Sequence, residues 1–200
     1  MAQYAKEQFT SPKGNMRWCF ITGEGRKDKY SVVISVPEAD AKPAMEAIDL
    51  FWKENKPKQA KPRPKSTGYK YEEDEETGEQ TGNVFFSLST GTSFPSGDAK
   101  VVKVFRAKPP VVELDLQGKK IGAESLGRAI GSLAIFEYEG SFGTTLYLDA
   151  ISLSTFTEYV GGVDESSVTV DEDADDLNFE AKADVSTVAD EAQPTETPRV

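Results

Sequence analysis

The segment from residue 30 to residue 55 reads YSVVISVPEADAKPAMEAIDLFWKEN and contains a strand pattern followed directly by a helix pattern. Before Pro37 the apolar residues largely alternate with serine, which is the period of a β-strand. After this proline the apolar residues recur every three or four positions, which is the spacing of one helix face. The sequence therefore predicts a strand over residues 30–36 and a helix over residues 41–55.

Strand patterns lie on both sides of this segment, separated by turns rich in glycine and polar residues. The further predicted strands cover residues 16–21, 84–88, 100–106, 111–115, 132–139 and 144–159. The last two strands flank a glycine-containing turn, which is typical of a hairpin. Six or seven strands with one helix after the second favour a mainly β fold, a small antiparallel barrel of the OB type.

Residues 56–70, KPKQAKPRPKSTGYK, form a predicted loop that is rich in both proline and lysine. Seven positive charges fall between Lys53 and Lys70. A solvated linker is one interpretation of this loop. The alternative is a cationic track for a phosphate backbone, because the prolines keep the segment extended. The EEDEETGEQTG segment that follows is predicted to be an exposed hairpin tip or loop.

The charges of this chain are sorted along its length. Residues 1–162 hold 21 Lys and Arg against 22 Asp and Glu, whereas residues 163–200 hold 2 against 12. The second segment has a single aromatic residue, Phe179, and no apolar periodicity. Such a segment buries too little apolar surface to offset the entropy of ordering. We therefore expect a folded domain over residues 1–162 and a disordered acidic tail over residues 163–200.

The residue types argue against an enzyme or a cofactor site. The chain has no histidine, which excludes Ser-His-Asp and Cys-His catalysis and imidazole zinc sites. No glycine-rich phosphate loop occurs. Asp171, Asp173 and Asp175 have the spacing of a calcium loop, but Asp176 stands where that loop needs glycine. We predict a protein that is not an enzyme and has neither cofactor nor metal.

The cysteine content and the hydropathy of the chain indicate its cellular location. Cys19 is the single cysteine, so the chain has no disulfide framework. No apolar run approaches the roughly 20 residues that a membrane span needs, and the N-terminus does not read as a signal peptide. The expected location is the cytoplasm, with no membrane partner.

The strand alternation indicates which aromatic residues face solvent. Phe85, Phe105, Tyr138 and Tyr147 fall on faces with polar or small neighbours, whereas Phe136 and Trp18 sit among apolar residues and are assigned to the core. Aromatic platforms beside cations suit single-stranded nucleic acid. Alternatively, these rings pack a second sheet face or a dimer contact. The predicted DNA-binding residues are Phe85, Lys100, Lys103, Phe105, Arg106, Tyr138, Tyr147, Lys61, Arg63 and Lys65.

The order of three segments adds a family resemblance. KYSVVISVPE leads into the helix, VVELDLQGKKIGAESLGRAIGSLAIFEYEG spans residues 111–140, and GTTLYLDAISLSTFTEYVGG runs into the acidic tail. In this order, which covers most of residues 15–176, the chain resembles the replicative single-stranded DNA-binding proteins of tailed bacteriophages. The resemblance implies an OB fold and sequence-independent binding of single strands during phage DNA replication, recombination or repair.

The resemblance also implies a role for the tail. In that family the acidic tail often ends in an aromatic residue that acts as a hook for a polymerase or other replication proteins, such as a helicase-primase. This chain ends in Thr-Glu-Thr-Pro-Arg-Val, which leaves two alternatives. Either the hook is internal, with the partner-binding residues Asp171, Asp173, Asp175, Asp176 and Phe179, or the partner interaction differs from that of the family. A homodimer is compatible with the sequence.

The sequence is also compatible with three other functions. The first is a non-enzymatic interaction or inhibitor module whose acidic tail mimics nucleic acid, and it does not need cationic strand faces. The second is a β-sandwich virion protein or carbohydrate-binding module, which has no evident use for a polyanionic tail. The third is a metal-dependent nuclease that uses carboxylates, which magnesium-dependent cleavage would reveal.

Overall fold

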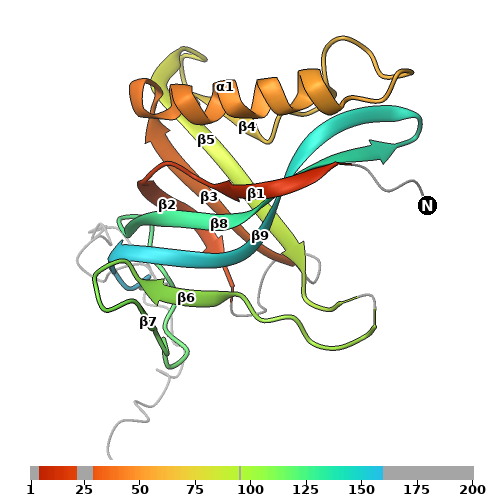
Figure 1. Ribbon diagram of the computed structural model, residues 1–200. Coiled ribbons are helices and arrows are strands. Elements are labelled where there is room, and N and C mark those ends of the chain that lie inside the picture. Colours follow the sequence, from red (N-terminus) through yellow and green to blue (C-terminus); the bar gives the residue numbers. More distant parts are fainter. Residues whose placement is uncertain (1–4, 22–28, 95, 160–200) are drawn as a thin grey trace, which may run out of the picture. The chain divides into compact units, whose positions relative to one another are not determined.

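The computed structural model describes residues 5–21, 29–94 and 96–159 (Figure 1). The chain divides into two units, Met1–Gly161 and Gly162–Val200, and every described residue belongs to the first. The predicted acidic tail, including Asp171, Asp173, Asp175, Asp176 and Phe179, therefore lies outside the described residues.

Five strands close into a barrel, which confirms the mainly β, OB-type fold. They pair in the ring β2-β3-β5-β9-β8, and β8 pairs again with β2. Every neighbouring pair is antiparallel except β5 with β9. The ring strands are β2 (Gly14–Phe20), β3 (Lys29–Pro37), β5 (Gln80–Gly91), β8 (Leu126–Tyr138) and β9 (Ser141–Thr155).

Four shorter strands extend this ring at its edges. They are β1 (Lys6–Thr10) on β8, β4 (Tyr69–Glu73) on β5, β6 (Lys103–Arg106) on β9 and β7 (Val112–Glu113) on β6. The sequence predicts neither β1 nor β4, because both are short and mostly polar, so their pairing with a long neighbour decides their conformation.

The single helix of the described residues, α1 (Glu38–Asn55), crosses one end of the barrel, whereas β6 and β7 lie at the other (Figure 1). It follows the second of the predicted strands, with β1 as an additional strand before both. The helix starts three residues earlier than predicted, and its first turn carries acidic side chains that favour a helix N-terminus. Its buried face is Ala41, Ile48, Phe51 and Trp52.

The predicted alternation in the ring strands is largely confirmed. The inward residues Phe86, Leu88, Leu146 and Leu148 are fully buried or nearly so, as are Val104 of the edge strand β6 and Val102 just before it. In the same strands Ser87 and Tyr147 are exposed, and Phe85 is half-buried. Burying one face of each strand supplies the main driving force for folding and leaves the outer face free to bind a ligand.

The core assignment of Trp18 is wrong, and Phe136 is only half-buried. A β-bulge interrupts the pairing of β2 with β3 between Arg17 and Phe20. Trp18 sits in this bulge with φ 46°. The additional residue shifts the alternation, so Trp18 leaves the face of the buried Met16.

The strand β4 is fixed against α1 by two tyrosines. The Tyr69 hydroxyl donates hydrogen bonds to the Asp49 carboxylate at 3.0 and 3.1 Å, and the Tyr71 hydroxyl donates to Glu38 Oε1 at 3.4 Å. Burial, together with the Asp49 carboxylate, raises the pKa of Tyr69 to about 12. With the tyrosines turned toward the helix, Lys70 occupies the opposite face of β4.

The basic loop is anchored at several points rather than being a free linker. The Trp52 indole Nε1 donates to the Pro62 carbonyl at 3.0 Å. Further along, the Lys65 amide donates to the Phe142 carbonyl at 2.8 Å, and the Thr144 amide donates to the Ser66 carbonyl at 2.9 Å. These bonds tie residues 62–66 to the helix and to the β8–β9 hairpin.

Candidate nucleic-acid interface

The outer face of β5 is a stripe of small side chains bordered by aromatic rings. Phe85, Ser87 and Ser89 alternate outward, because Phe86 and Leu88 point into the core. Ser89 pairs with Tyr147 of β9. Phe85 pairs with Lys70 on one side and with a serine of β3 on the other. The serines leave the rings accessible, and the pairing brings Phe85 and Tyr147 to one face.

Trp18 joins this face from β2. Its ring centroid lies 5.7 Å from that of Phe85, with an interplanar angle of 77°. Its side chain is nevertheless 55% exposed, the largest exposure of any tryptophan or phenylalanine among the described residues. An exposed ring held edge-on by a second ring is a pre-oriented platform for stacking. Sequence alternation misses this residue, because the bulge leaves no recognisable signal in the sequence.

A groove of about 470 Å³ continues the surface beyond Trp18. Its walls combine three aromatic side chains with two cationic ones, and the complete lining is Arg17, Trp18, Cys19, Phe20, Lys120, Ile121, Ala123 and Tyr159. Burial raises the pKa of the Cys19 thiol to about 12, so this wall stays uncharged at neutral pH. The groove therefore offers apolar stacking surface beside positive charge.

A fixed carboxylate lies close to this groove. Glu72 accepts hydrogen bonds from Thr81 Oγ1 at 2.7 Å and Asn83 Nδ2 at 2.8 Å, and its Oε1 lies 3.7 Å from Arg17 Nη2. Burial of Glu72 raises its pKa, but these hydrogen bonds and the Arg17 charge outweigh burial and hold the pKa below its ordinary value. Glu72 is thus anionic at neutral pH and forms an ion pair with Arg17, whose side chain lines the groove.

Replacing Glu72 with glutamine is expected to tighten binding of single-stranded DNA about two- to fivefold. The amide keeps the size and the acceptor oxygen but frees Arg17 from a partly exposed ion pair, whose strength is about 0.2–1 kcal/mol. Fluorescence anisotropy with a labelled oligothymidine measures the change. Glu54→Gln, on the exposed part of α1, is the matched control for the lost charge. If Glu72→Gln and the wild type bind with equal affinity, Glu72 does not influence DNA binding and is not part of the interface.

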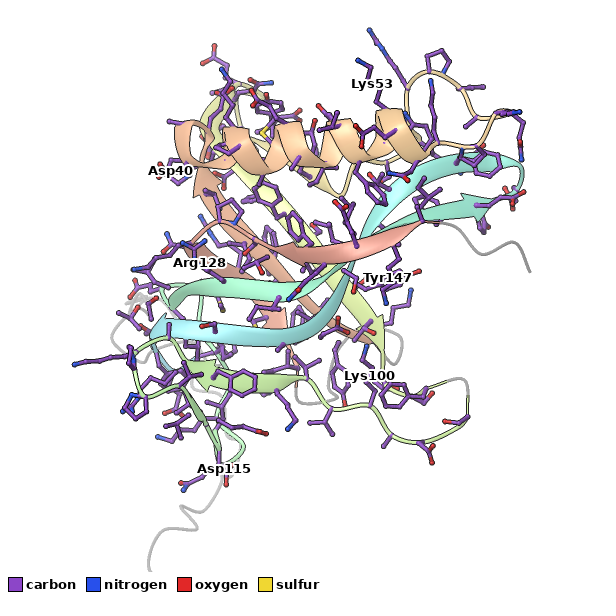
Figure 2. All side chains as sticks on the ribbon, viewed as in Figure 1. Asp40, Lys53, Lys100, Asp115, Arg128 and Tyr147 are labelled. Atoms are coloured by element: carbon purple, nitrogen blue, oxygen red, sulfur yellow. The ribbon has the colours of Figure 1, made fainter. Side chains whose placement is uncertain are left out.

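Tyr147 and Lys100, two predicted site residues, lie on the same side of the barrel (Figure 2). The Tyr147 ring is 40% exposed, and Lys6 Nζ lies 5.7 Å from its centroid. Lys100 Nζ donates to Thr90 Oγ1 at 2.7 Å and to Asp149 Oδ1 at 3.2 Å. Tyr147 is therefore available for stacking with a cation beside it, whereas the Lys100 charge is already partnered.

The predicted residues on β6 form a separate group beside the end of β9. Lys103 Nζ lies 2.9 Å from Glu113 Oε2, and Arg106 Nη2 donates to the Pro110 carbonyl at 3.4 Å. Phe105 is half-buried and pairs with Ser152 of β9. The structure does not bring this group to Phe85, and the Lys103 charge is balanced within its own hairpin.

The remaining predicted residues belong to the basic loop and to the β8–β9 hairpin that this loop contacts. Lys65 Nζ lies 5.0 Å from the centroid of the Tyr138 ring, which is largely exposed. Lys61 and Arg63 are exposed in the same anchored loop. Figure 2 shows Lys53, where the run of positive charges begins, at the C-terminal end of α1 and close to this loop. An aromatic platform with several cations thus forms a second cluster.

Residues 5–21, 29–94 and 96–159 contain neither a cluster of metal-binding side chains nor a membrane-spanning helix. No group of three or more acidic or cysteine side chains is arranged to hold a metal ion. No helix in this part of the chain is both long and apolar enough to cross a lipid bilayer.

Solved structures of two phage proteins share this architecture. The crystal structure of gp2.5, a single-stranded DNA-binding protein encoded by bacteriophage T7, matches with a TM-score of 0.55 and 18% identity, covering 85% of this chain and 98% of that one. The single-stranded DNA-binding protein from bacteriophage Enc34 matches with a TM-score of 0.56 and 16% identity, covering 80% and 88%.

A third match is the same Enc34 protein in complex with single-stranded DNA, with a TM-score of 0.53, 14% identity and coverage of 77% and 89%. No protein-family model matches the sequence, and a search of curated proteins found no match. At these identities the likeness shows the fold. The chain has the OB-type fold of phage single-stranded DNA-binding proteins, as the resemblance in its sequence implies.

Proposed function

We propose that this chain is a sequence-independent single-stranded DNA-binding protein that acts without catalysis in phage DNA replication, recombination or repair. The observation that carries the proposal is the series of accessible rings across one barrel face, Trp18, Phe85 and Tyr147, with cations beside them. The solved complex of a structurally similar protein with single-stranded DNA supports the same assignment.

In this mechanism the rings bind bases and the cations bind phosphates. Stacking contributes about 1–3 kcal/mol per base and tolerates any base, because every base has a π face. The β5 stripe between the rings is serine, which offers few groups for reading base edges. Arg17, Lys6 and the anchored loop with Lys61, Arg63 and Lys65 would neutralise the backbone and release counterions. Affinity would then depend on salt rather than on sequence.

The acidic segment supplies the second part of the proposal. Residues 163–200 would compete with DNA for the cationic face and, once displaced, contact replication proteins such as a polymerase or helicase-primase. Asp171, Asp173, Asp175, Asp176 and Phe179 are the proposed contact residues. The site of action would be the cytoplasm of an infected cell.

Equilibrium binding tests the proposal directly. Anisotropy of a labelled oligothymidine, titrated from about 50 to about 400 mM salt, should show binding whose affinity falls linearly in a log–log plot. A mixed-sequence single strand should bind about as well, and a duplex of the same sequence should bind more weakly. Absence of binding at the lowest salt, by the full chain and by residues 1–162 alike, would refute the proposed function.

A further inference from the structure

A small polar pocket of about 190 Å³ lies where β5 leaves β4 and meets β9. Gly68 turns the chain beside it with φ 80°, and a Cβ at this position would come within 2.9 Å of Leu146 Cγ. Glycine therefore lets the loop pass close to β9. The pocket is lined by Ser66, Gly68, Tyr69, Lys70, Ser87, Thr144, Thr145 and Leu146.

The chemistry of this lining is that of an anion site. The hydroxyls of Ser66, Ser87 and Thr145 donate no hydrogen bond to any other described residue. The Lys70 ammonium has only a long contact of 4.0 Å with Glu73 Oε2. No carboxylate lines the pocket. Free hydroxyl donors beside a lightly engaged ammonium suit the tetrahedral oxygens of a phosphate.

The position of the pocket matches the proposed path of a strand. Ser87 stands midway between Phe85 and Ser89 on the outer face of β5, and Ser89 pairs with Tyr147. Phe85 and Ser89 are four residues apart, which is about 13 Å along a strand. Two bases stacked on Phe85 and Tyr147 would therefore leave the connecting backbone above this pocket.

We propose that the pocket is a phosphate subsite for the nucleic-acid backbone between the bases stacked on Phe85 and Tyr147. This inference rests on the proposed function and adds to it a specific phosphate contact. Its lining of hydroxyl groups beside one ammonium group fits a phosphate. The pocket thus fixes the path of the strand along β5 without reading the sequence.

Amide chemical shifts distinguish phosphate contact from base contact. The probes are an oligothymidine of eight nucleotides and an abasic oligonucleotide of the same length, which carries phosphates without bases. Both probes should shift the backbone amides of Ser66, Gly68 and Ser87, whereas the Trp18 indole signal should respond mainly to the oligothymidine. If oligothymidine shifts the Trp18 indole but leaves the pocket amides unmoved, the subsite is refuted and the proposed function stands.

Charge reversal in the pocket gives a second readout. Ser87→Asp should weaken oligothymidine binding about tenfold or more, because a carboxylate would replace a phosphate-binding hydroxyl. Thr10→Asp on β1 adds the same charge at another exposed strand position and should change affinity less than about twofold. Equal losses in the two variants would overturn the subsite. Absence of binding by the wild type would instead refute the proposed function itself.

The lysine of the pocket can be tested by salt dependence. Lys70→Gln should lower the slope of log affinity against log salt by about 0.7, which is the value for one phosphate contact on a single strand. Lys42→Gln, on the exposed side of α1, is the matched control and should leave the slope unchanged. An unchanged slope in Lys70→Gln would contradict the phosphate contact.

Discussion

Replacing Trp18 with alanine is expected to lower the affinity for single-stranded DNA by roughly 5- to 150-fold, which corresponds to one stacked base at about 1–3 kcal/mol. The ring is exposed and touches the face through Phe85, so its removal leaves the barrel core intact. Alanine retains the Cβ, and the backbone at φ 46° is therefore no more strained than in the wild type. Anisotropy measures the affinity, and circular dichroism checks the fold.

Two variants control this experiment. Trp18→Phe keeps an aromatic platform and should retain most of the affinity. Leu50→Ala removes an apolar side chain of similar exposure, 53%, from α1 and should leave binding unchanged. Trp52 is buried on the inner face of α1, so quenching of tryptophan fluorescence by oligothymidine should disappear in Trp18→Ala. Unaltered affinity together with unaltered quenching would exclude Trp18 from the interface.

Removing residues 163–200 is expected to tighten binding by about tenfold at low salt and to have little effect at high salt. The removed segment carries 12 acidic residues against 2 basic ones, so it competes with DNA for the same cations. Screening weakens this competition, because the Debye length shrinks from about 30 Å at 0.01 M to about 3 Å at 1 M salt. Anisotropy titrations of both chains at several salt concentrations measure the effect.

A length-matched control separates charge from bulk. A chain in which an uncharged Gly/Ser segment of equal length replaces residues 163–200 should behave like the truncated chain if charge is the cause. If the chain with the Gly/Ser segment instead binds DNA as weakly as the full chain, the acidic segment lowers affinity by steric exclusion and not by its charge. No gain in affinity for either variant at low salt would contradict competition by the acidic segment.

The sequence predicts the barrel well, because each ring strand buries one face and therefore carries a period of two. Leu146 and Leu148 in β9, and Phe86 and Leu88 in β5, alternate with outward residues, as the pattern indicates. The helix is equally visible in the spacing of Ile48, Phe51 and Trp52. The edge strands β1 and β4 are not visible, because they bury little and owe their conformation to a neighbour.

The candidate site is less predictable, because its geometry depends on contacts between distant residues. Trp18 is misassigned since a bulge reverses its direction, and a single sequence does not show the bulge. Lys103 and Lys100 look like free cations, but Glu113 and Asp149 partner them from other strands. Phe85 and Tyr147 are identified correctly as outward-facing rings, although they lie 62 positions apart in the chain.

The closure of the barrel has a mechanical consequence. The β2-β3-β5 meander and the β8–β9 hairpin are joined by only two short strand pairings. β5 pairs with β9 at two positions, and β2 pairs with β8 at two positions. Because these pairings contribute few hydrogen bonds, we expect the barrel to open there first, and amide hydrogen exchange would register that opening. A strand of DNA that contacts both Phe85 of β5 and Tyr147 of β9 would connect these two strands across their short pairing. Bound DNA would then slow exchange at Leu88 and Leu146, so ligand and barrel would hold each other closed.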